Sequence, residues 1–319
     1  MTQRPTAVIV SAYGSAHPSP LSDEDIYAYL KHITQFYRSV DPEPELFEHL
    51  KNRFEKSGPS PMYPMTETVA RKLQVELDKR DLGTYDVRFA MKHSPPLLEE
   101  VAHDLTAQGF EKAVSLPLAP FRSRMSTEGY HTLARRGVGD EESIEWRCID
   151  GWHMDETFLA MWEGLIRAAL PDGDGLVTIF TNHSLPVHIR KWDDPYESDF
   201  RATASALADR CGLGDWDCAF QSVGGGGGGA TEWLGPDLPE ILRKWKDKGH
   251  GNFLLAPIGF LNAHLEVSYD IDIDLQATAK NMAVTVTRTD MPDDNPLFIQ
   301  TLADRVMGVV GDQSSVMTA

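Results

Sequence analysis

Cysteine and long apolar runs are both scarce in this sequence, and each shortage excludes a class of protein. The three cysteines, Cys148, Cys211 and Cys218, form no CxxC pair and are too few for a four-cysteine zinc or iron–sulfur site. We therefore expect reduced thiols, as in the cytoplasm. No run of about eighteen apolar residues occurs, so we expect no membrane-spanning helix, and the N-terminal residues lack a signal-peptide pattern.

Basic residues are also few. The 319 residues include 30 Lys and Arg against 48 Asp and Glu, which gives a formal net charge of −18. This excess of negative charge repels phosphate backbones and anionic lipids, so we expect neither nucleic acid nor membrane as a partner. No heptad pattern or exposed apolar stripe indicates assembly, and a monomer is expected. The apolar content of 41% is enough for a globular core, and the length suits two domains.

One glycine run, Gly224–Gly229, satisfies the GxGxxG pattern only because every residue in it is glycine. No Lys-Ser/Thr pair follows it, and no clear acidic partner lies about 20 residues further on. We interpret the run as a loop, and we expect no bound nucleotide.

Apolar strand-like runs alternate along the chain with amphipathic helical stretches, which predicts an α/β fold with parallel sheets. In the first half we expect strands at 7–13, 87–93, 113–118 and 144–149, and helices at 23–37, 44–56, 66–79, 95–108 and 126–136. In the second half we expect strands at 176–181, 218–222, 253–257 and 283–289, and helices at 156–169, 198–211, 238–247, 265–274 and 295–310.

A repeated sequence pattern indicates that the chain has two similar halves. The segments Gly109–Leu118 and Gly249–Ile258 each combine a helix-ending glycine, an apolar strand and a proline at the same offset. We therefore predict two Rossmann-like domains, 1–150 and 151–319, each a parallel sheet flanked by helices, with a cleft between them. An alternative places the last helix, at about 295–310, against the first domain.

The strongest functional signal is a histidine at a strand end. The apolar run 177–181 stops at His183 in a polar turn, which is typical of the carboxyl edge of an open α/β sheet, where ligands bind. His264 and Glu266 follow a second apolar run, 253–258, so the two segments together suggest metal or proton chemistry. A capping or core histidine is the alternative. In a strand His264 and Glu266 would share a face, whereas in a helix they would diverge by about 200°.

An acidic series follows Glu266. Glu266, Asp270 and Asp274 are spaced by four, so on a helix they form a stripe about 12 Å long. Such a stripe predicts a path of carboxylates for divalent cations or protons. A solvated helix face is one alternative. Because Asp270, Asp272 and Asp274 alternate, an exposed strand is another.

Three polar residues are expected at the corresponding edge of the first sheet. Tyr13 ends the first strand before Gly14, and it is either a packing residue or a phenolate ligand to iron. Lys92 and His93 end the strand at 87–93, and they either contact a carboxylate-bearing substrate or are ordinary surface groups.

Nearly the whole chain resembles the ferrochelatase family, most closely its soluble coproporphyrin III branch. The His-Ser-Leu-Pro, Trp-Leu-Gly-Pro and His-Leu-Glu segments in this order are highly specific together. The matching segments are Ser11-Ala12-Tyr13-Gly14, Gly58-Pro59-Ser60-Pro61, Lys92-His93, Leu118-Ala119-Pro120, Asn182-His183-Ser184-Leu185-Pro186, Asp194-Pro195-Tyr196, Phe220-Gln221-Ser222, Trp233-Leu234-Gly235-Pro236 and His264-Leu265-Glu266-Val267.

The resemblance implies two chelatase-like domains around a porphyrin cleft, and a lyase that inserts Fe2+ into a free-base porphyrin with release of two protons in haem biosynthesis. Iron is then a substrate, and no cofactor or iron–sulfur cluster is required. The resemblance assigns metal binding and proton transfer to His183 and Glu266. It makes Tyr13 the ligand on the opposite face and favours coproporphyrin III. It extends the acidic path through Asp270 and Asp274. The implied porphyrin-binding residues are Tyr13, Ser60, Lys92, His93, Ser123, Arg124 and Trp233.

Two departures from the family pattern stand out. An arginine pair that holds propionates in close relatives is replaced by Thr34-Gln35, with Arg38, Arg122 and Arg124 as candidate substitutes. Ala263 stands where the family usually has Asp. The alternatives to a coproporphyrin enzyme are a protoporphyrin IX ferrochelatase, a cobalt or nickel chelatase for a sirohydrochlorin-type tetrapyrrole, and a haem-binding protein without catalysis.

Overall fold

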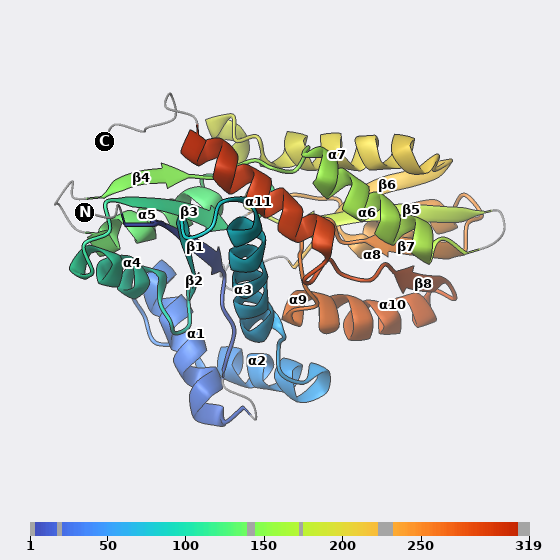
Figure 1. Cartoon of the computed structure of the whole chain (residues 1–319). Helices are drawn as coiled ribbons and strands as arrows, with labels where there is room; N and C mark the ends of the chain where they lie inside the picture. Colours follow the sequence, from blue (N-terminus) through green and yellow to red (C-terminus); the bar gives the residue numbers. More distant parts are fainter. Residues whose placement is uncertain (1–3, 18–20, 139–143, 172–174, 223–231, 312–319) are drawn as a thin grey trace. The chain divides into compact units, whose positions relative to one another are not determined.

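The strands form two four-stranded parallel sheets in the computed structural model, which describes residues 4–17, 21–138, 144–171, 175–222 and 232–311 (Figure 1). The chain divides into two compact units. The first unit comprises 1–118, 126–150 and 294–319, and the second comprises 119–125 and 151–293. The α/β fold with two parallel sheets flanked by helices is thus confirmed. The glycine run at 224–229 lies outside the described residues.

The first unit is built on a sheet with strand order β2-β1-β3-β4. Its strands are β1 (Thr6–Ala12), β2 (Tyr85–Met91), β3 (Lys112–Pro117) and β4 (Glu145–Cys148). Its helices are α1 (Asp23–Arg38), α2 (Pro44–Ser57), α3 (Met62–Arg80), α4 (Leu98–Ala107), α5 (Thr127–Val138) and α11 (Pro296–Gly311). A capping box precedes α1, because the Ser22 hydroxyl accepts from the Asp25 amide and the Asp25 carboxylate accepts from the Ser22 amide.

Alternate residues of β1 face opposite sides of this sheet, as the pleat requires. Ala7 and Ile9 pack in a cluster with buried residues of α4 and α5. The last helix, α11, packs beside α3, and its Asp304 pairs with Arg80 of α3 (Figure 1). The guanidinium of Arg147, on β4, also donates to a carbonyl near the end of α11. A segment distant in sequence therefore completes the first unit.

The second unit repeats the topology, with strand order β6-β5-β7-β8. Its strands are β5 (Leu176–His183), β6 (Asp215–Gln221), β7 (Asn252–Ala256) and β8 (Thr285–Arg288). Its helices are α6 (Glu156–Ala169), the 3-10 helix η1 (Val187–Trp192), α7 (Tyr196–Cys211), α8 (Leu238–Lys246), α9 (Leu265–Ser268), the π-helix η2 (Asp270–Leu275) and α10 (Gln276–Asn281).

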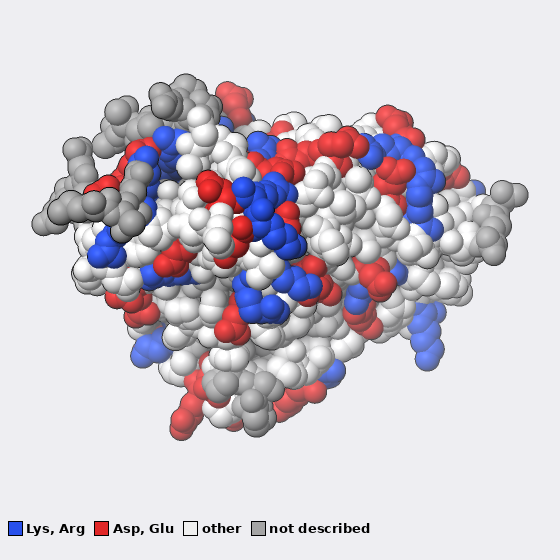
Figure 2. Space-filling view, in the orientation of Figure 1, with Lys and Arg blue, Asp and Glu red and all other residues white. Residues whose placement is uncertain are grey.

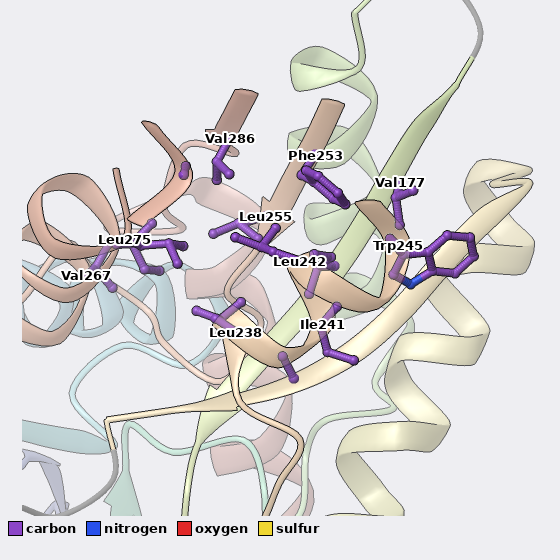
Figure 3. Packing of buried hydrophobic residues seen from close by; sticks show 14 of the residues in the cluster. Val177, Leu238, Ile241, Leu242, Trp245, Phe253, Leu255, Val267, Leu275 and Val286 are labelled. Carbon is purple, nitrogen blue, oxygen red and sulfur yellow. The ribbon is translucent and has the colours of Figure 1, made fainter. Parts of the chain in front are cut away.

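One face of the second sheet carries a large apolar cluster (Figure 3). Leu238, Ile241, Leu242 and Trp245 of α8 belong to this cluster together with the strand residues Val177, Phe253 and Leu255. Val267 of α9 and Leu275 of η2 belong to the same cluster, and Val267 is fully buried. Burial of one such side chain stabilises by roughly 1.5–3 kcal/mol, so this cluster anchors the short α9 against the sheet.

Most element predictions are confirmed, with boundaries shifted by a few residues. The main difference lies in 265–274, where the predicted helix is present but continues through the π-helix η2. The alternative of an exposed strand for the alternating aspartates is wrong. The 3-10 helix η1 had no counterpart in the prediction.

Lys and Arg are interspersed with Asp and Glu over the face drawn in Figure 2, rather than gathered in one patch. The three cysteines are free, and burial raises the pKa of Cys218 to about 12. No helix in the described ranges has the length and apolar character needed to cross a membrane.

Candidate active site

The second unit carries its polar strand-end residues at a point where the strand order reverses. In open parallel sheets ligands bind at such points, beyond the carboxyl ends of the strands. In the order β6-β5-β7-β8 the reversal lies between β5 and β7. β5 ends at His183, and the segment leaving β7 carries His264 and Glu266. The predicted position of these residues therefore coincides with the position at which open parallel sheets bind ligands.

His183 and Glu266 meet directly. The Nε2 atom of His183 lies 3.4 Å from Oε1 of Glu266, and both side chains are about one-third exposed. Nδ1 of His183 is bonded to the carbonyl of Ser184, and because a carbonyl only accepts, Nδ1 carries a hydrogen. In the neutral imidazole the lone pair is then on Nε2, facing the carboxylate. Two electron-rich atoms at this separation are suited to share a proton or a cation.

The electrostatics of the pair favour a proton on the imidazole. Burial lowers the pKa of His183, but the Glu266 carboxylate and the more distant Asp270 outweigh it, so the pKa lies above its usual 6.5. The charged form of His183 is therefore stabilised by its neighbour.

The backbone at His183 is held by a buried polar cluster. Oδ1 of Asn182 accepts from the His183 amide at 2.9 Å, and the Tyr196 hydroxyl lies 2.9 Å from both Asn182 Oδ1 and the His183 carbonyl. Burial, with the nearby charges of Glu266 and Asp194, raises the pKa of Tyr196, so its hydroxyl remains a donor. A Cβ on Gly259 would lie 1.9 Å from Asn182 Oδ1, so only glycine leaves room for this cluster.

Glu266 is positioned through its backbone. His264 caps the start of α9, and its Nδ1 accepts from the Glu266 amide at 3.2 Å. The Glu266 carbonyl accepts from Nε2 of Gln221 at 2.8 Å. His264 is the N-cap of α9 and has an extended backbone, whereas Glu266 lies within the helix. The Glu266 carboxylate is the group that lies against His183.

Only part of the predicted acidic path lies close to His183 and Glu266. Asp270 accepts from the Ser222 hydroxyl at 2.6 Å, and its charge contributes to the raised pKa of His183. Asp272 is bound by Arg288 instead, and Asp274 is exposed. Within the described ranges, no group of three or more His, Cys, Asp and Glu side chains is arranged to hold a metal ion. His183 and Glu266 therefore offer a pair of protein ligands rather than a closed metal cage.

The first unit gathers Tyr13 and His93 at the carboxyl ends of β1 and β2. The parallel ladder continues past the strands, because the amides of Lys92 and His93 bond to the carbonyls of Ala12 and Tyr13. The rings of Tyr13 and His93 meet edge to face with centroids 4.6 Å apart. His93 is 1% exposed, and its Nε2 has no hydrogen-bond partner among the described residues. Burial, with the charge of Lys92 and the proximity of His32, lowers the pKa of His93 to about 2, so this imidazole is neutral.

Lys92 is a buried cation surrounded by aromatic rings. Its Nζ lies between 5.2 and 5.3 Å from the ring centroids of Phe36, Tyr37 and Tyr130, and it donates to the Tyr37 hydroxyl at 2.9 Å. The side chain is 5% exposed, and no carboxylate of the described residues pairs with it. Buried charges ordinarily take an opposite charge, so this position suits an anionic group of a ligand.

The other residues that were predicted to bind porphyrin lie in both units and have different bonding partners. Ser60 accepts from the Met62 amide in the first unit, whereas Ser123 and the Arg124 amide bind the Asp194 carboxylate in the second. Trp233 pairs with Pro186, in the segment that follows His183.

The residues at the missing arginine pair have local partners. The Thr34 hydroxyl bonds to the Lys31 carbonyl of its own helix, and Gln35 bonds to Asp41. Neither residue supplies a cation in place of arginine.

Solved structures of chelatases share the fold with two parallel sheets. The same fold occurs in the sirohydrochlorin chelatase SirB of Bacillus subtilis subspecies spizizenii, solved with cobalt, with a TM-score of 0.59 over 98% of both chains at 11% identity. CbiX, solved as the terminal enzyme of sirohaem biosynthesis in denitrifying bacteria, matches with a TM-score of 0.53 over 95% of this chain and 98% of that one at 13% identity.

Residues 5–309 match the family model for ferrochelatase, and the chain belongs to the ferrochelatase family. It is 30% identical to the coproporphyrin III ferrochelatase of Bacillus subtilis over 98% of this chain and 100% of the relative. It is 31% identical to that of Geobacillus kaustophilus over 96% of both, and 32% identical to the ferrochelatase of Herpetosiphon aurantiacus over 95% of this chain and 98% of the relative. The reaction is therefore metal insertion into a porphyrin in haem biosynthesis, and the family disfavours the cobalt or nickel alternative.

Sequence reasoning gave no role to the residues that hold the pair in place. Asn182, Tyr196 and Gln221 stand in segments that match the family, but a pattern of letters does not reveal which atoms they bind. Gly259 carried no signal beyond its place after β7.

Proposed function

We propose that this ferrochelatase inserts Fe2+ into coproporphyrin III, giving Fe-coproporphyrin, with His183 as proton acceptor. The observation that carries the proposal is the contact between Nε2 of His183 and Oε1 of Glu266. A free-base porphyrin holds two pyrrole N–H protons that must leave as iron enters, so a base beside the metal is required.

The pair supplies that base. The unprotonated Nε2 of neutral His183 takes the first pyrrole proton, and the adjacent Glu266 carboxylate stabilises the imidazolium that forms. Release of this proton to solvent frees Nε2 to take the second pyrrole proton. Before proton transfer, the same nitrogen and oxygen are ligands that Fe2+ accepts, and a two-ligand site binds iron weakly enough to release it to the porphyrin. We further propose that Asp270 leads iron or protons to and from Glu266. Asp274 extends this path toward solvent.

Coproporphyrin III is favoured over protoporphyrin IX by two features. Relatives that match over nearly the whole chain carry that name. Coproporphyrin bears propionates where protoporphyrin has vinyl groups, and Lys92 is a buried cation without a carboxylate partner among the described residues. We propose that Lys92 and His93 contact the porphyrin, with a propionate beside Lys92, and that Tyr13 faces the iron.

The other proposed porphyrin contacts have weaker support. They are Ser60 in the first unit, and Ser123, Arg124 and Trp233 in the second. Ser123 is already bonded to Asp194, so its hydroxyl reaches a ligand only as an acceptor or after that bond breaks.

The test is anaerobic insertion of Fe2+ into coproporphyrin III and protoporphyrin IX in parallel, followed by loss of free-base fluorescence. We expect faster consumption of coproporphyrin III. Preference for protoporphyrin IX would retain the chelatase and overturn the substrate. Tight binding of Fe-coproporphyrin with no insertion into either porphyrin would indicate a haem-binding protein instead.

A further inference from the structure

Gln221, the last residue of β6, joins the two segments that carry His183 and Glu266. Its Nε2 donates to the Glu266 carbonyl at 2.8 Å, and its Oε1 accepts from the Thr181 hydroxyl at 2.7 Å. Its own carbonyl accepts from the Ser184 amide at 2.8 Å. Gln221 is 5% exposed and Thr181 is fully buried, so solvent does not compete for these bonds.

The bonds fix the orientation of the amide. The Glu266 carbonyl can only accept, so the nitrogen of the Gln221 amide must face it. The oxygen then faces Thr181, which has a hydrogen to donate. Exchange of the two amide atoms would set the amide oxygen against the Glu266 carbonyl and leave a buried acceptor unpaired, which is unfavourable.

Glu266 needs such a restraint because its helix is short. Helix α9 has 4 residues, and a single helical turn is marginal by itself. Val267 anchors the turn in the apolar cluster, but an apolar contact has no direction. The hydrogen bonds at the Glu266 peptide do have a direction: His264 holds its amide, and Gln221 holds its carbonyl.

We propose that Gln221 is the positioning residue of the metal site, setting the separation between Nε2 of His183 and Oε1 of Glu266 through a relay from Thr181 to the Glu266 carbonyl. Strand β5 carries both Thr181 and His183, so the relay ties the carboxylate to the strand that carries the imidazole. The inference rests on the proposed roles of His183 and Glu266. It adds that an uncharged residue outside the pair controls how well the pair works.

The first test is Gln221→Met, which keeps the length of the side chain and removes both bonds. We expect the kcat of iron insertion to fall by at least about tenfold, since a displacement on the order of 1 Å can cost about a hundredfold. The KM for coproporphyrin should not change, because Gln221 is not proposed to touch the porphyrin. Thr181→Val should give a smaller fall and Thr181→Ser little change, since serine keeps the hydroxyl.

Gln74→Met is the matched control. Gln74 also makes two bonds through its side-chain amide, to the Val87 amide at 2.7 Å and the Tyr85 carbonyl at 3.1 Å, but these join α3 to β2 in the first unit. Loss of these bonds should lower the melting temperature about as much as Gln221→Met does, and leave the kcat within about twofold.

The decisive comparison places Gln221→Met in a Glu266→Gln background. A residue that acts through the Glu266 carboxylate should cause no further loss there, whereas a general defect in the fold should lower the residual rate again. Equal proportional losses in both backgrounds, a fall in kcat with Gln74→Met as large as with Gln221→Met, or a normal kcat for Gln221→Met would overturn the relay.

The two proposals can fail separately. An inactive Glu266→Gln together with a normal Gln221→Met would refute the relay and leave the proposed function intact. A fully active Glu266→Gln would refute both. If Gln221→Met does not fold, the contrast between Thr181→Val and Thr181→Ser decides, and equal rates for these variants would refute the relay.

Discussion

His93 and His183 lie at the carboxyl edges of two sheets with the same strand order, yet their surroundings hold them in opposite states. His93 is buried beside Lys92, and its pKa falls to about 2. His183 lies beside Glu266, and its pKa rises above 6.5 despite burial. The fold places an imidazole at each edge, and the neighbouring charge decides which of them accepts a proton.

The comparison also separates two roles. A histidine that stays neutral at all physiological pH values can offer a hydrogen bond to a ligand but no change of charge. A histidine beside a carboxylate can take up a proton and stabilise it. Acid–base chemistry is therefore expected in the second unit, and neutral contacts to the porphyrin in the first.

Replacement of His183 should have the largest effect. His183→Ala removes the proposed base, and we expect iron insertion to slow by at least ~100-fold in a fluorescence assay. His250→Ala is the matched control, because His250 also faces a carboxylate, Asp215 at 3.7 Å, but lies before β7 at the opposite edge of the same sheet. Near-normal insertion by His183→Ala would remove His183 from the reaction.

Neutralising the Glu266 carboxylate should lower the pKa of His183, so that it changes in the direction seen for His93. Glu266→Gln removes the charge that raises the pKa of His183, so that pKa should fall. Because the base must be unprotonated, the rate declines as the pH drops through this pKa, and the acid limb of the rate–pH profile should move to lower pH. We expect a similarly large loss of rate, about 100-fold, at the optimum.

Asp215→Asn serves as the control for this profile, since it neutralises a carboxylate beside His250 instead. An acid limb that stays in place in Glu266→Gln would assign the titration to another group.

Neighbouring groups also set the pKa of a third imidazole, that of His131, and there the expected effect is on the stability of the fold rather than on the reaction rate. In the first unit, Nδ1 of His131 lies 2.9 Å from the Ser115 hydroxyl and Nε2 lies 3.0 Å from Asp150. Burial lowers the pKa of His131, but Asp150 and Cys148 outweigh it and raise the pKa to about 9. The folded state then holds the proton more tightly than the unfolded state, so this stabilisation is complete below about pH 6.5 and is lost as the pH rises through about 9.

The size of this contribution is ~3 kcal/mol, from a shift between 6.5 and about 9. Urea unfolding at pH 6.5 and 9.5 should show the loss in the wild type, and His131→Gln, which carries no charge at either pH, should reduce it. An equal pH dependence in both proteins would show that His131 is uncharged in the folded state.

The sequence was sufficient for the sheets, for most helices and for His183 and Glu266. Apolar periodicity reports which side chains are buried, and the end of an apolar run reports the edge of a sheet, so Val177–His183 and its partner strands were predictable. The family resemblance supplied the roles that periodicity cannot.

The sequence was not sufficient for the geometry around these residues. The relative direction of the His264 and Glu266 side chains depends on where α9 begins, and a segment of 4 residues carries too weak a periodic signal to show that. The π-helix η2 is defined by backbone hydrogen bonds that span one residue more than those of an α-helix, and no pattern of residues predicts them. The role of Gln221 depends on the direction of one amide.

The position of α11 has a consequence for biosynthesis. This helix packs on α3 and receives a bond from Arg147 of β4, yet it is encoded after every strand and helix of the second unit. A ribosome releases the chain from its N-terminus, and domains fold as units once their residues have emerged. The second unit can thus be complete while the first still lacks its covering helix. Ribosome-bound chains that stop before Pro296 should carry a protease-resistant second unit and a first unit still open to cleavage.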